Sequence, residues 1–343
     1  MACHMRALSP PKSPEENCCA QVVPCVYATN LSAPVSSEPL MMGYQPYVEH
    51  LNELVQALVH GDGSATARNA EAVHEALDDA PEALRRMVTL QDRRDAGAFF
   101  TSSKLADLAW APLLSTIGES SIIVDPTCGA GSLLIPPLRA LLPSADPLRV
   151  ASQLRGRDLE GIFIEAARAR LTLTVASSQP GIDQRDLASL RFPGLQQGDA
   201  VRQMESLLDG ATHIVLSPPY NDVIAPAGCP WASGEINHSA LFTEEAIRYM
   251  PADSRMVAIL PKMLRRGPRY AKWRDAIRQM ANIDHVTPWG AFDSQTLVDV
   301  FLMYLTKRGA KTAPIPGGVT VTELGPGRAG WRRGGGWVRM RPL

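Results

Sequence analysis

From residue 120 onward the chain alternates short β-branched runs with longer amphipathic stretches, and this alternation limits the possible folds more than any other feature. Strands are expected at Ser121–Asp125, Leu154–Asp158, His213–Leu216, Met256–Leu260, Ile283–Val286 and Val298–Leu305. Helices are expected between them, for example over Ile162–Leu173, Leu241–Met250 and Arg269–Met280. Such alternation is typical of an α/β, doubly wound, mostly parallel sheet with helices on both faces. The last two runs have no helix between them, which predicts an antiparallel hairpin at one edge.

The regions on either side of this alternation have a different character. Val48, Leu51, Leu54 and Leu58 recur at helical spacing, which predicts a small N-terminal helical lobe over residues 44–94. Residues 1–43 hold several prolines and four of the six cysteines without periodicity, which indicates a disordered leader or an upstream extension of the reading frame. Residues 308–343 are predicted to form a flexible, Gly/Arg-rich basic tail.

Charge and composition exclude several classes of protein. With 34 basic and 35 acidic residues the formal net charge is −1, which excludes a polycation but leaves room for a local basic patch. No apolar run approaches the ~18 residues that cross a bilayer, and the first ten residues lack a signal-peptide core. We therefore expect a cytoplasmic protein. No Cys-x-x-Cys pair exists, and His213, His238 and His285 lack ligand-like spacing, so no metal site is expected.

A glycine turn follows the first strand. The stretch Val124-Asp125-Pro126-Thr127-Cys128-Gly129-Ala130-Gly131-Ser132-Leu133 reads as a strand, an acid, a tight turn and an apolar helix start. In open α/β sheets, ligands bind beyond the carboxyl ends of the strands, and glycines let the backbone approach them closely. The chain has neither Gly-x-Gly-x-x-Gly nor Gly-Lys-Ser/Thr here, which disfavours a nicotinamide or nucleoside-triphosphate site.

A second turn, Ser217-Pro218-Pro219-Tyr220, directly follows the strand that ends at Leu216. The two prolines remove two N–H donors, so the carbonyls remain free to accept from a ligand amine. The hydroxyl before the prolines and the ring after them suit a planar, amino-bearing group. The alternative interpretation is an ordinary Pro-Pro turn at a strand end.

Together with Gly97-Ala98-Phe99-Phe100-Thr101, these two turns resemble the signatures of S-adenosylmethionine-dependent amino-methyltransferases of DNA. Their order is similar to that of the adenine-N6 class, and in particular to type I modification subunits and related solitary enzymes. The resemblance covers residues 95–307. It implies a methyltransferase catalytic domain there, with the Rossmann-like class I fold and a seven-stranded sheet.

The resemblance implies S-adenosylmethionine as the cofactor. The acid and glycines of the first turn would surround its methionine part, and Thr101 would reach the methionine carboxylate. Asp158 would bind the ribose hydroxyls, with Glu160 and Glu165 as rivals, and Asp199 would contact the adenine amine unless it is only a surface-loop residue. The implied cofactor residues are Phe100, Thr101, Asp125, Pro126, Gly129, Gly131, Asp158 and Asp199.

The resemblance also implies the catalytic residues Ser217, Pro218, Pro219 and Tyr220. Ser217 Oγ and the Pro218 carbonyl would accept from the target amine, and Tyr220 would stack on a base flipped out of the duplex. Adenine N6 is favoured over cytosine N4. The serine keeps cytosine open, because this position is usually Asn or Asp in adenine enzymes and is more often Ser in cytosine-N4 enzymes.

A basic segment, residues 262–274, follows the strand that ends at Leu260. Its cations are Lys262, Arg265, Arg266, Arg269, Lys272 and Arg274. They are interleaved with Tyr270 and Trp273, and they either contact DNA phosphates or form a solvated helix face. Trp331, Arg332, Arg333 and Trp337 of the tail are a weaker nucleic-acid candidate.

The sequence thus predicts a DNA methyltransferase of a restriction-modification or defence system. Its partners would be DNA and a separate specificity or restriction subunit, because little chain after Lys307 is left for target recognition. The loop Asn221–His238 is the alternative source of sequence choice. Three alternatives stay open. They are an RNA guanine-N2 or adenine methyltransferase, a protein-glutamine methyltransferase, and a non-catalytic subunit that binds cofactor or DNA within a defence complex.

Overall fold

The computed structural model describes residues 38–60, 72–74, 76–77, 80–96, 98–293, 298–309 and 320–321. Nearly all of the predicted leader and tail lie outside these residues, as do Gly97 and the tail residues Trp331, Arg332, Arg333 and Trp337. Within the described part of the chain, no helix is long and apolar enough to cross a membrane.

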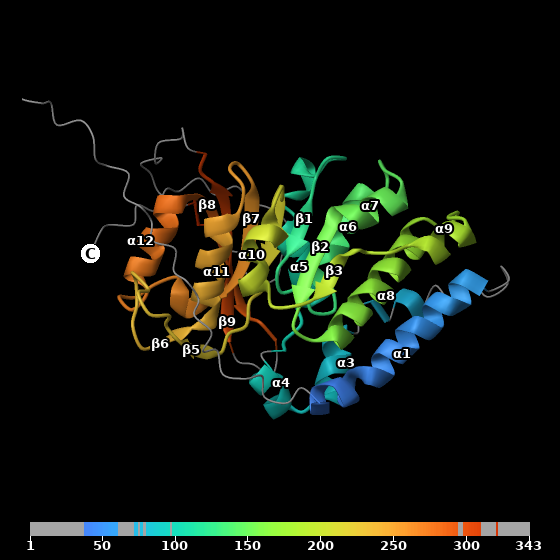
Figure 1. The fold of residues 1–343 in the computed structure, drawn as a ribbon, viewed down its shortest axis with the longest axis horizontal. Helices are drawn as coiled ribbons and strands as arrows, with labels where there is room; N and C mark the ends of the chain where they lie inside the picture. The colour runs from blue at the N-terminus through green and yellow to red at the C-terminus, as the bar shows by residue number, and fades with distance from the viewer. Residues whose placement is uncertain are drawn as a thin grey trace, which may run out of the picture.

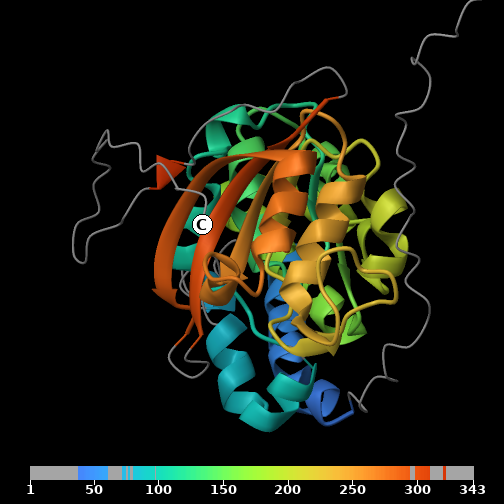
Figure 2. The same ribbon diagram turned by 90° about the vertical axis from the view of Figure 1, so that its left-hand side faces the viewer.

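The main sheet has the strand order β10-β8-β9-β7-β4-β1-β2-β3. Its strands are β1 (Ile123–Asp125), β2 (Leu154–Asp158), β3 (Gly194–Gln197), β4 (His213–Leu216), β7 (Arg255–Pro261), β8 (Ala281–Ala291), β9 (Asp299–Lys307) and β10 (Thr320–Val321). All neighbours pair in parallel except that β9 is antiparallel to both β7 and β8. This confirms the predicted doubly wound sheet of seven strands, to which β10 adds two residues. Figure 2 shows β8 and β9, in orange and red, running side by side.

Helices cover both faces of the sheet. They are α5 (Ser103–Trp110), α6 (Ile135–Leu141), α7 (Pro147–Gln153), α8 (Gly161–Ser178), α9 (Gln184–Ser189), α10 (Ala200–Leu208), α11 (His238–Tyr249) and α12 (Ala271–Met280). Short 3₁₀ turns lie at η2 (Leu114–Thr116), η3 (Ser132–Leu134) and η4 (Lys262–Leu264). One apolar core joins the sheet to α5, α6 and α8, and a second joins it to α10, α11 and α12.

The apolar strand runs form central strands because both of their faces are buried. Along β7, Val257 and Ile259 pack into the core of α5 and α8, whereas Met256, Ala258 and Leu260 pack into the core of α11 and α12. Successive side chains point to opposite faces of a strand, so a strand between two helical layers needs apolar residues throughout.

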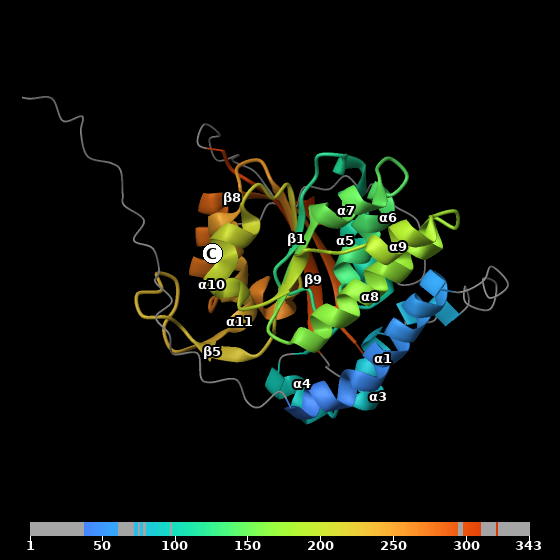
Figure 3. The same cartoon turned by 45° about the vertical axis from the view of Figure 1, so that its right-hand side comes forward.

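The N-terminal helices pack against the sheet domain. They are α1 (Glu38–His60), α3 (Ala80–Met87) and α4 (Leu90–Ala96), and residues 72–74 and 76–77 are also helical. In Figure 3, α1 lies alongside α8. Tyr44, Val48 and Leu51 of α1 share one core with α8. The division into domains at residues 44–94 and 95–307 stays a prediction.

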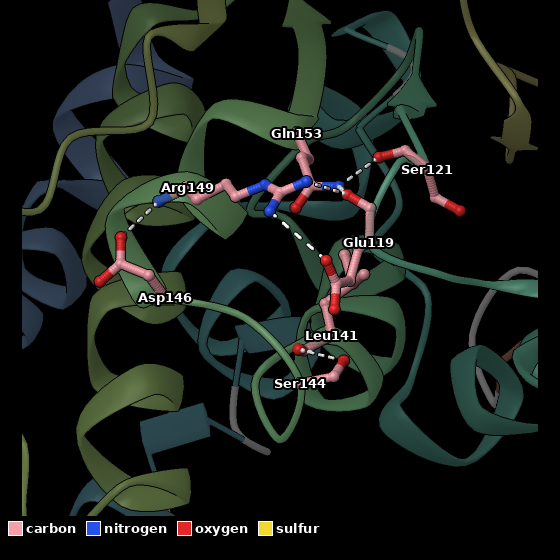
Figure 4. Close-up of polar contacts among 7 residues, drawn as sticks. All are labelled: Glu119, Ser121, Leu141, Ser144, Asp146, Arg149 and Gln153. Carbon is pink, nitrogen blue, oxygen red and sulfur yellow. Dashed lines mark hydrogen bonds and ion pairs between the residues drawn. The ribbon is translucent and has the colours of Figure 1, made fainter.

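A hydrogen-bond network fixes the amino ends of β1 and β2 (Figure 4). The Gln153 side chain, directly before β2, donates to the carbonyl oxygens of Glu119 and Ser121, both at 2.7 Å. Arg149 also donates to the Glu119 carbonyl, at 3.2 Å. These bonds join the starts of two strands that pair in parallel, with Asp125 opposite Gly156, so Asp125 and Asp158 lie near each other at the carboxyl ends.

Candidate functional site

Four predicted site residues lie at the carboxyl ends of four adjacent strands. Asp125 ends β1, Asp158 ends β2, Asp199 follows β3, and Ser217 follows β4. Strand order places them along one edge of the sheet, where open α/β folds bind ligands. In Figure 1 this edge is at the bottom, on the same side as α4 and the small sheet of β5 (Asp222–Ile224) and β6 (Glu235–Asn237).

The glycine turn has a left-handed backbone at Gly129 (φ 49°) and Gly131 (φ 77°). A Cβ at Gly129 would lie 2.8 Å from Cε1 of Phe100, so the predicted cofactor residue Phe100 packs directly on the turn. Phe100 is held in place by Phe163 of α8 and Tyr44 of α1, with ring centroids 4.8 and 5.6 Å away. The turn therefore requires glycine for both its conformation and its packing.

Asp158 connects the second strand to the glycine turn. Its Oδ2 accepts from the Gly129 N–H at 3.0 Å, and its Oδ1 accepts from the Glu160 N–H at 2.9 Å. Each carboxylate oxygen keeps a further lone pair that can accept from a ligand hydroxyl. Of the two rivals, Glu160 precedes α8 in the same turn, whereas the exposed Glu165 lines a groove between α8 and α1. Asp158 is thus the acid in contact with the glycine turn.

Asp125 is 1% exposed, and its Oδ2 has no hydrogen-bond partner among the described residues. Its Oδ1 accepts from the Thr127 N–H at 3.0 Å. Burial raises the pKa of Asp125 to about 7; the Asp158 charge adds to the rise, and the Thr127 hydrogen bond opposes it. Burial likewise raises the pKa of Asp158 to about 6. The edge thus holds two neighbouring carboxyl groups whose ionised forms are only partly compensated by backbone N–H donors, which favours a cationic ligand.

We expect cationic-ligand affinity and protein stability to depend on pH in opposite directions. Both carboxyl groups have raised pKa values in the folded state, so the free energy of unfolding should fall as pH rises from about 4 to about 7. A cation favours the ionised forms, so its affinity should rise over about pH 6 to 7 and then level off. Calorimetric titration of S-adenosylmethionine across this range, in buffers of different ionisation enthalpy, would count the protons released. An affinity that does not change with pH, or equals that of Asp125→Asn, would contradict this assignment.

The remaining predicted cofactor residues lie around the same edge. Asp199 caps α10, with Oδ1 accepting from the Val201 N–H at 2.9 Å, and pairs with Arg202 Nε at 3.2 Å. Thr101 is buried directly before α5, and Pro126 is buried in the glycine turn. Ser102 occupies the position where proline is usual in the resembled element, and its hydroxyl caps α5 by accepting from the Leu105 N–H.

The Pro-Pro turn is held on both sides. The Tyr220 hydroxyl donates to the Ile259 carbonyl at 3.2 Å, and the Asn237 side chain donates to the Tyr220 carbonyl at 2.6 Å. Burial raises the pKa of Tyr220, while a hydrogen bond with the Ser217 side chain opposes the rise, so these two hydroxyls are neighbours. The ring of Phe292 meets that of Tyr220 edge-on at 5.5 Å. The turn thus presents a hydroxyl, a carbonyl and an aromatic wall at fixed positions.

The basic segment is partly used within the fold. Lys262 pairs with Asp299 at 2.8 Å, Arg269 donates to the Glu235 carbonyl at 2.8 Å, and Arg274 donates to the carbonyls of Leu264 and Gly267. Tyr270 and Trp273 are buried in the core, so the interleaved aromatics serve packing. Four of the six cations of the basic segment are exposed to solvent, namely Lys262, Arg266, Arg269 and Lys272.

Three side chains at this edge were missed by sequence reasoning. Phe292, after β8, reaches Tyr220 only because the β8–β9 hairpin folds beside β7. His238 has two buried ring nitrogens without partners in the described chain; burial lowers its pKa to about 4, and nearby Asp199 opposes this. Leu159 is exposed directly after Asp158. Only Leu159 had a sequence signal, as an apolar residue after the strand-end acid.

The buried Arg170 of α8 braces the glycine turn. Its guanidinium donates to the Ala130 carbonyl at 2.5 Å, the Ser132 hydroxyl at 3.1 Å and the Leu77 carbonyl at 2.5 Å. We expect Arg170→Met to lower the free energy of unfolding by about 3 kcal/mol, because buried acceptors lose their donors. Urea denaturation would measure this, with the exposed Arg185→Met as a control that changes stability by less than about 0.5 kcal/mol. Equal losses in both variants would contradict the bracing role.

Comparison with known proteins bears on the fold. No protein-family model and no curated protein matches the chain. Among solved structures, the DrdV–DNA complex aligns with TM-score 0.59 at 10% identity, over 83% of this chain and 37% of that one. The type IIL restriction-modification enzyme MmeI in complex with DNA gives 0.51 at 14% identity, over 71% of this chain and 41% of that one.

A protein from Vibrio vulnificus YJ016, described as the modification subunit of a type I restriction enzyme, gives TM-score 0.50 at 14% identity. That alignment covers 76% of this chain and 54% of the other, so this chain spans about half or less of all three structures. The chain has the class I methyltransferase fold. Its strand order agrees with the predicted architecture, and open α/β sheets in general bind ligands at the edge that here carries Asp125, Asp158 and Ser217.

Proposed function

We propose that this chain transfers the methyl group of S-adenosylmethionine to an exocyclic amine of a DNA base, with adenine N6 favoured, within a restriction-modification or defence system. The observation that carries the proposal is the adjacency of two turns. The Asp158–Gly129 contact and the Ser217–Tyr220 turn lie at the ends of neighbouring strands in a methyltransferase fold. The similar structures of DrdV and MmeI are DNA complexes, which supports DNA as the substrate.

The residues at the edge fit S-adenosylmethionine. The Oδ2 of Asp125, which has no hydrogen-bond partner in the described part of the chain, and the nearby Asp158 complement a cationic ligand. Asp158 has lone pairs for ribose hydroxyls, and the exposed Leu159 beside it offers an apolar surface for the adenine ring. When bound, S-adenosylmethionine supplies an electrophilic methyl group on a sulfonium sulfur. Thr101 and Asp199 are proposed for the methionine carboxylate and the adenine amine.

The target amine is proposed to bind the Pro-Pro turn. Ser217 Oγ and the Pro218 carbonyl accept its two hydrogens, which draws the nitrogen toward a tetrahedral geometry and exposes its lone pair. Tyr220 stacks on the base, and Phe292 limits its movement at the edge. As the bond from the amine nitrogen to the methyl carbon forms, the methyl–sulfur bond would break and S-adenosylhomocysteine would leave. No strong base is needed, because the methylated nitrogen is then cationic and acidic and would lose its proton to water. Positioning and electrostatic alignment are therefore the main sources of rate.

Phosphate contacts are proposed for the cations of the basic segment, above all for the exposed Arg266 and Lys272. Cytosine N4 is the second candidate target, because a Ser217 hydroxyl replaces the usual amide or carboxylate. A separate subunit is proposed to supply sequence recognition.

Methyl transfer to nucleic acid tests the proposal directly. The full chain would be incubated with S-adenosylmethionine labelled in its methyl group and with unmethylated DNA, RNA or cell protein, followed by mass spectrometry of nucleosides and amino acids. N6-methyladenine in DNA is the expected product, and N4-methylcytosine would reassign the base. Label only in RNA or protein would reject DNA as the substrate. Cofactor binding without any transfer would favour a non-catalytic subunit.

A further inference from the structure

A small hairpin follows the Pro-Pro turn and is fixed to it. It consists of β5 (Asp222–Ile224) and β6 (Glu235–Asn237), paired antiparallel with Ile224 opposite Glu235. The Asn237 side chain donates to the Tyr220 carbonyl at 2.6 Å, and the His238 N–H donates to the Asn221 carbonyl at 2.8 Å. The hairpin therefore holds a fixed position relative to Tyr220.

The hairpin is also joined to the basic segment. The Asn237 N–H donates to the Tyr270 hydroxyl at 2.9 Å, and the Arg269 guanidinium donates to the Glu235 carbonyl at 2.8 Å. Tyr270 is buried, whereas Arg269 is exposed. The Pro-Pro turn, the hairpin and the basic segment are thus connected by hydrogen bonds, with the exposed cation Arg269 against the hairpin.

One large apolar side chain of the hairpin, Ile224, is exposed to solvent. Val223 and Ile236 of the hairpin pack on the core, but Ile224 is 69% exposed. Exposed large apolar residues also follow β2 and β7 at this edge, namely Leu159 and Met263. Leu159 directly follows Asp158, and Met263 belongs to η4. Of these three exposed residues, Ile224 is therefore the one that belongs to the hairpin fixed to Tyr220.

We propose that Ile224 is a wedge that enters duplex DNA and fills the space left by the extruded base. The proposal rests on the proposed function. Removing a base from the stack leaves an apolar gap between two base pairs. Aliphatic side chains such as isoleucine insert between base steps as wedges in other protein–DNA complexes. The cations beside the hairpin complement the phosphates that flank the gap. Ile224 then stabilises the flipped state of the DNA rather than the chemical step.

DNA with a preformed gap tests the wedge without requiring methyl transfer. The full chain would be titrated with a short mixed-sequence duplex, either intact or carrying one abasic site, and binding would be followed by fluorescence anisotropy. The wild-type protein should bind the abasic duplex about tenfold more tightly, because the apolar side chain fills a space that costs no unstacking. Ile224→Ala should lose this preference. The matched control is Leu148→Ala, which removes an exposed apolar residue of α7 at the opposite edge (Figure 1) and should keep the preference.

A methylation assay separates the wedge from the proposed function. On a substrate identified by the wild-type assay, Ile224→Ala should lower transfer to a normally paired target about tenfold, and a mispaired target base should restore most of the rate. Absence of abasic preference in the wild-type protein, or its persistence in Ile224→Ala, would overturn the wedge. If the protein bound the abasic duplex more tightly in a way that depends on Ile224, but transferred no methyl group, the wedge role would be supported and the proposed function would be rejected.

Discussion

Replacing Tyr220 with alanine should lower the rate of methyl transfer about 10²-fold or more at saturating cofactor. Stacking of a base on an aromatic ring contributes roughly 1–3 kcal/mol, and misplacement of a reacting group by about 1 Å can cost a further 10²-fold. Cofactor affinity should change little, because Tyr220 belongs to the proposed target pocket and Asp158 to the cofactor side. Single-turnover transfer to DNA, together with calorimetric titration of S-adenosylmethionine, would measure the two effects separately.

The control for this prediction is Tyr220→Phe. It keeps the ring and its edge-on contact with Phe292 but removes the hydroxyl that donates to the Ile259 carbonyl. We expect a loss of less than about tenfold, since one neutral hydrogen bond contributes about 1 kcal/mol. If Tyr220→Ala retained the wild-type rate, or if Tyr220→Phe were as damaged as Tyr220→Ala, stacking on Tyr220 would be rejected.

Replacing Asp158 with alanine should weaken S-adenosylmethionine binding by about 10²-fold or more. The carboxylate is proposed to accept from both ribose hydroxyls, and hydrogen bonds to charged groups contribute roughly 1.5–3 kcal/mol each. The Gly129 N–H would also lose its acceptor, which loosens the glycine turn. Titration calorimetry would measure the dissociation constant, and circular dichroism would verify that the variant is folded.

Glu160→Gln is the matched variant for Asp158→Ala, because Glu160 is the neighbouring acid that could replace it in the ribose contact. We expect its affinity for S-adenosylmethionine to stay within about threefold of wild type, since the substitution removes only the charge of a side chain that is not proposed to contact the ribose. A loss in Glu160→Gln that exceeds the loss in Asp158→Ala would move the ribose contact to Glu160.

The central strands were predictable because a strand that is buried on both faces requires a continuous run of apolar residues. The predicted run Leu154–Asp158 is β2 and His213–Leu216 is β4, and the most apolar run lies within β7. The strand β3 (Gly194–Gln197) was not predicted from its residues, because two of its four side chains are exposed glutamines at the sheet edge. The short hairpin of β5 and β6 was missed for a different reason, since each strand has only three residues and the side chains of β5 are largely unburied.

The aromatic residues of the basic segment show where composition misleads, whereas its DNA-binding role stays a prediction. Its cations and aromatics together suggested a nucleic-acid surface, but Trp273 donates to the Ala240 carbonyl inside the core, and Lys262 pairs with Asp299. A sequence pattern cannot distinguish an aromatic that stacks on a base from one that fills the space under α12. The partners that decide this, Ala240 and Asp299, lie more than 20 residues away along the chain.

By itself, the sequence determined the parallel sheet and the acid or turn at each strand end, because strand periodicity, glycine freedom and proline chemistry are local properties. Only the tertiary structure decided which groups meet. It placed Asp158 on the Gly129 N–H, Phe292 against Tyr220, and Arg170 beneath the glycine turn. These contacts join residues that are 29, 72 and 40 positions apart in the sequence. Their formation depends on strand order and helix packing, which no short stretch of residues encodes alone.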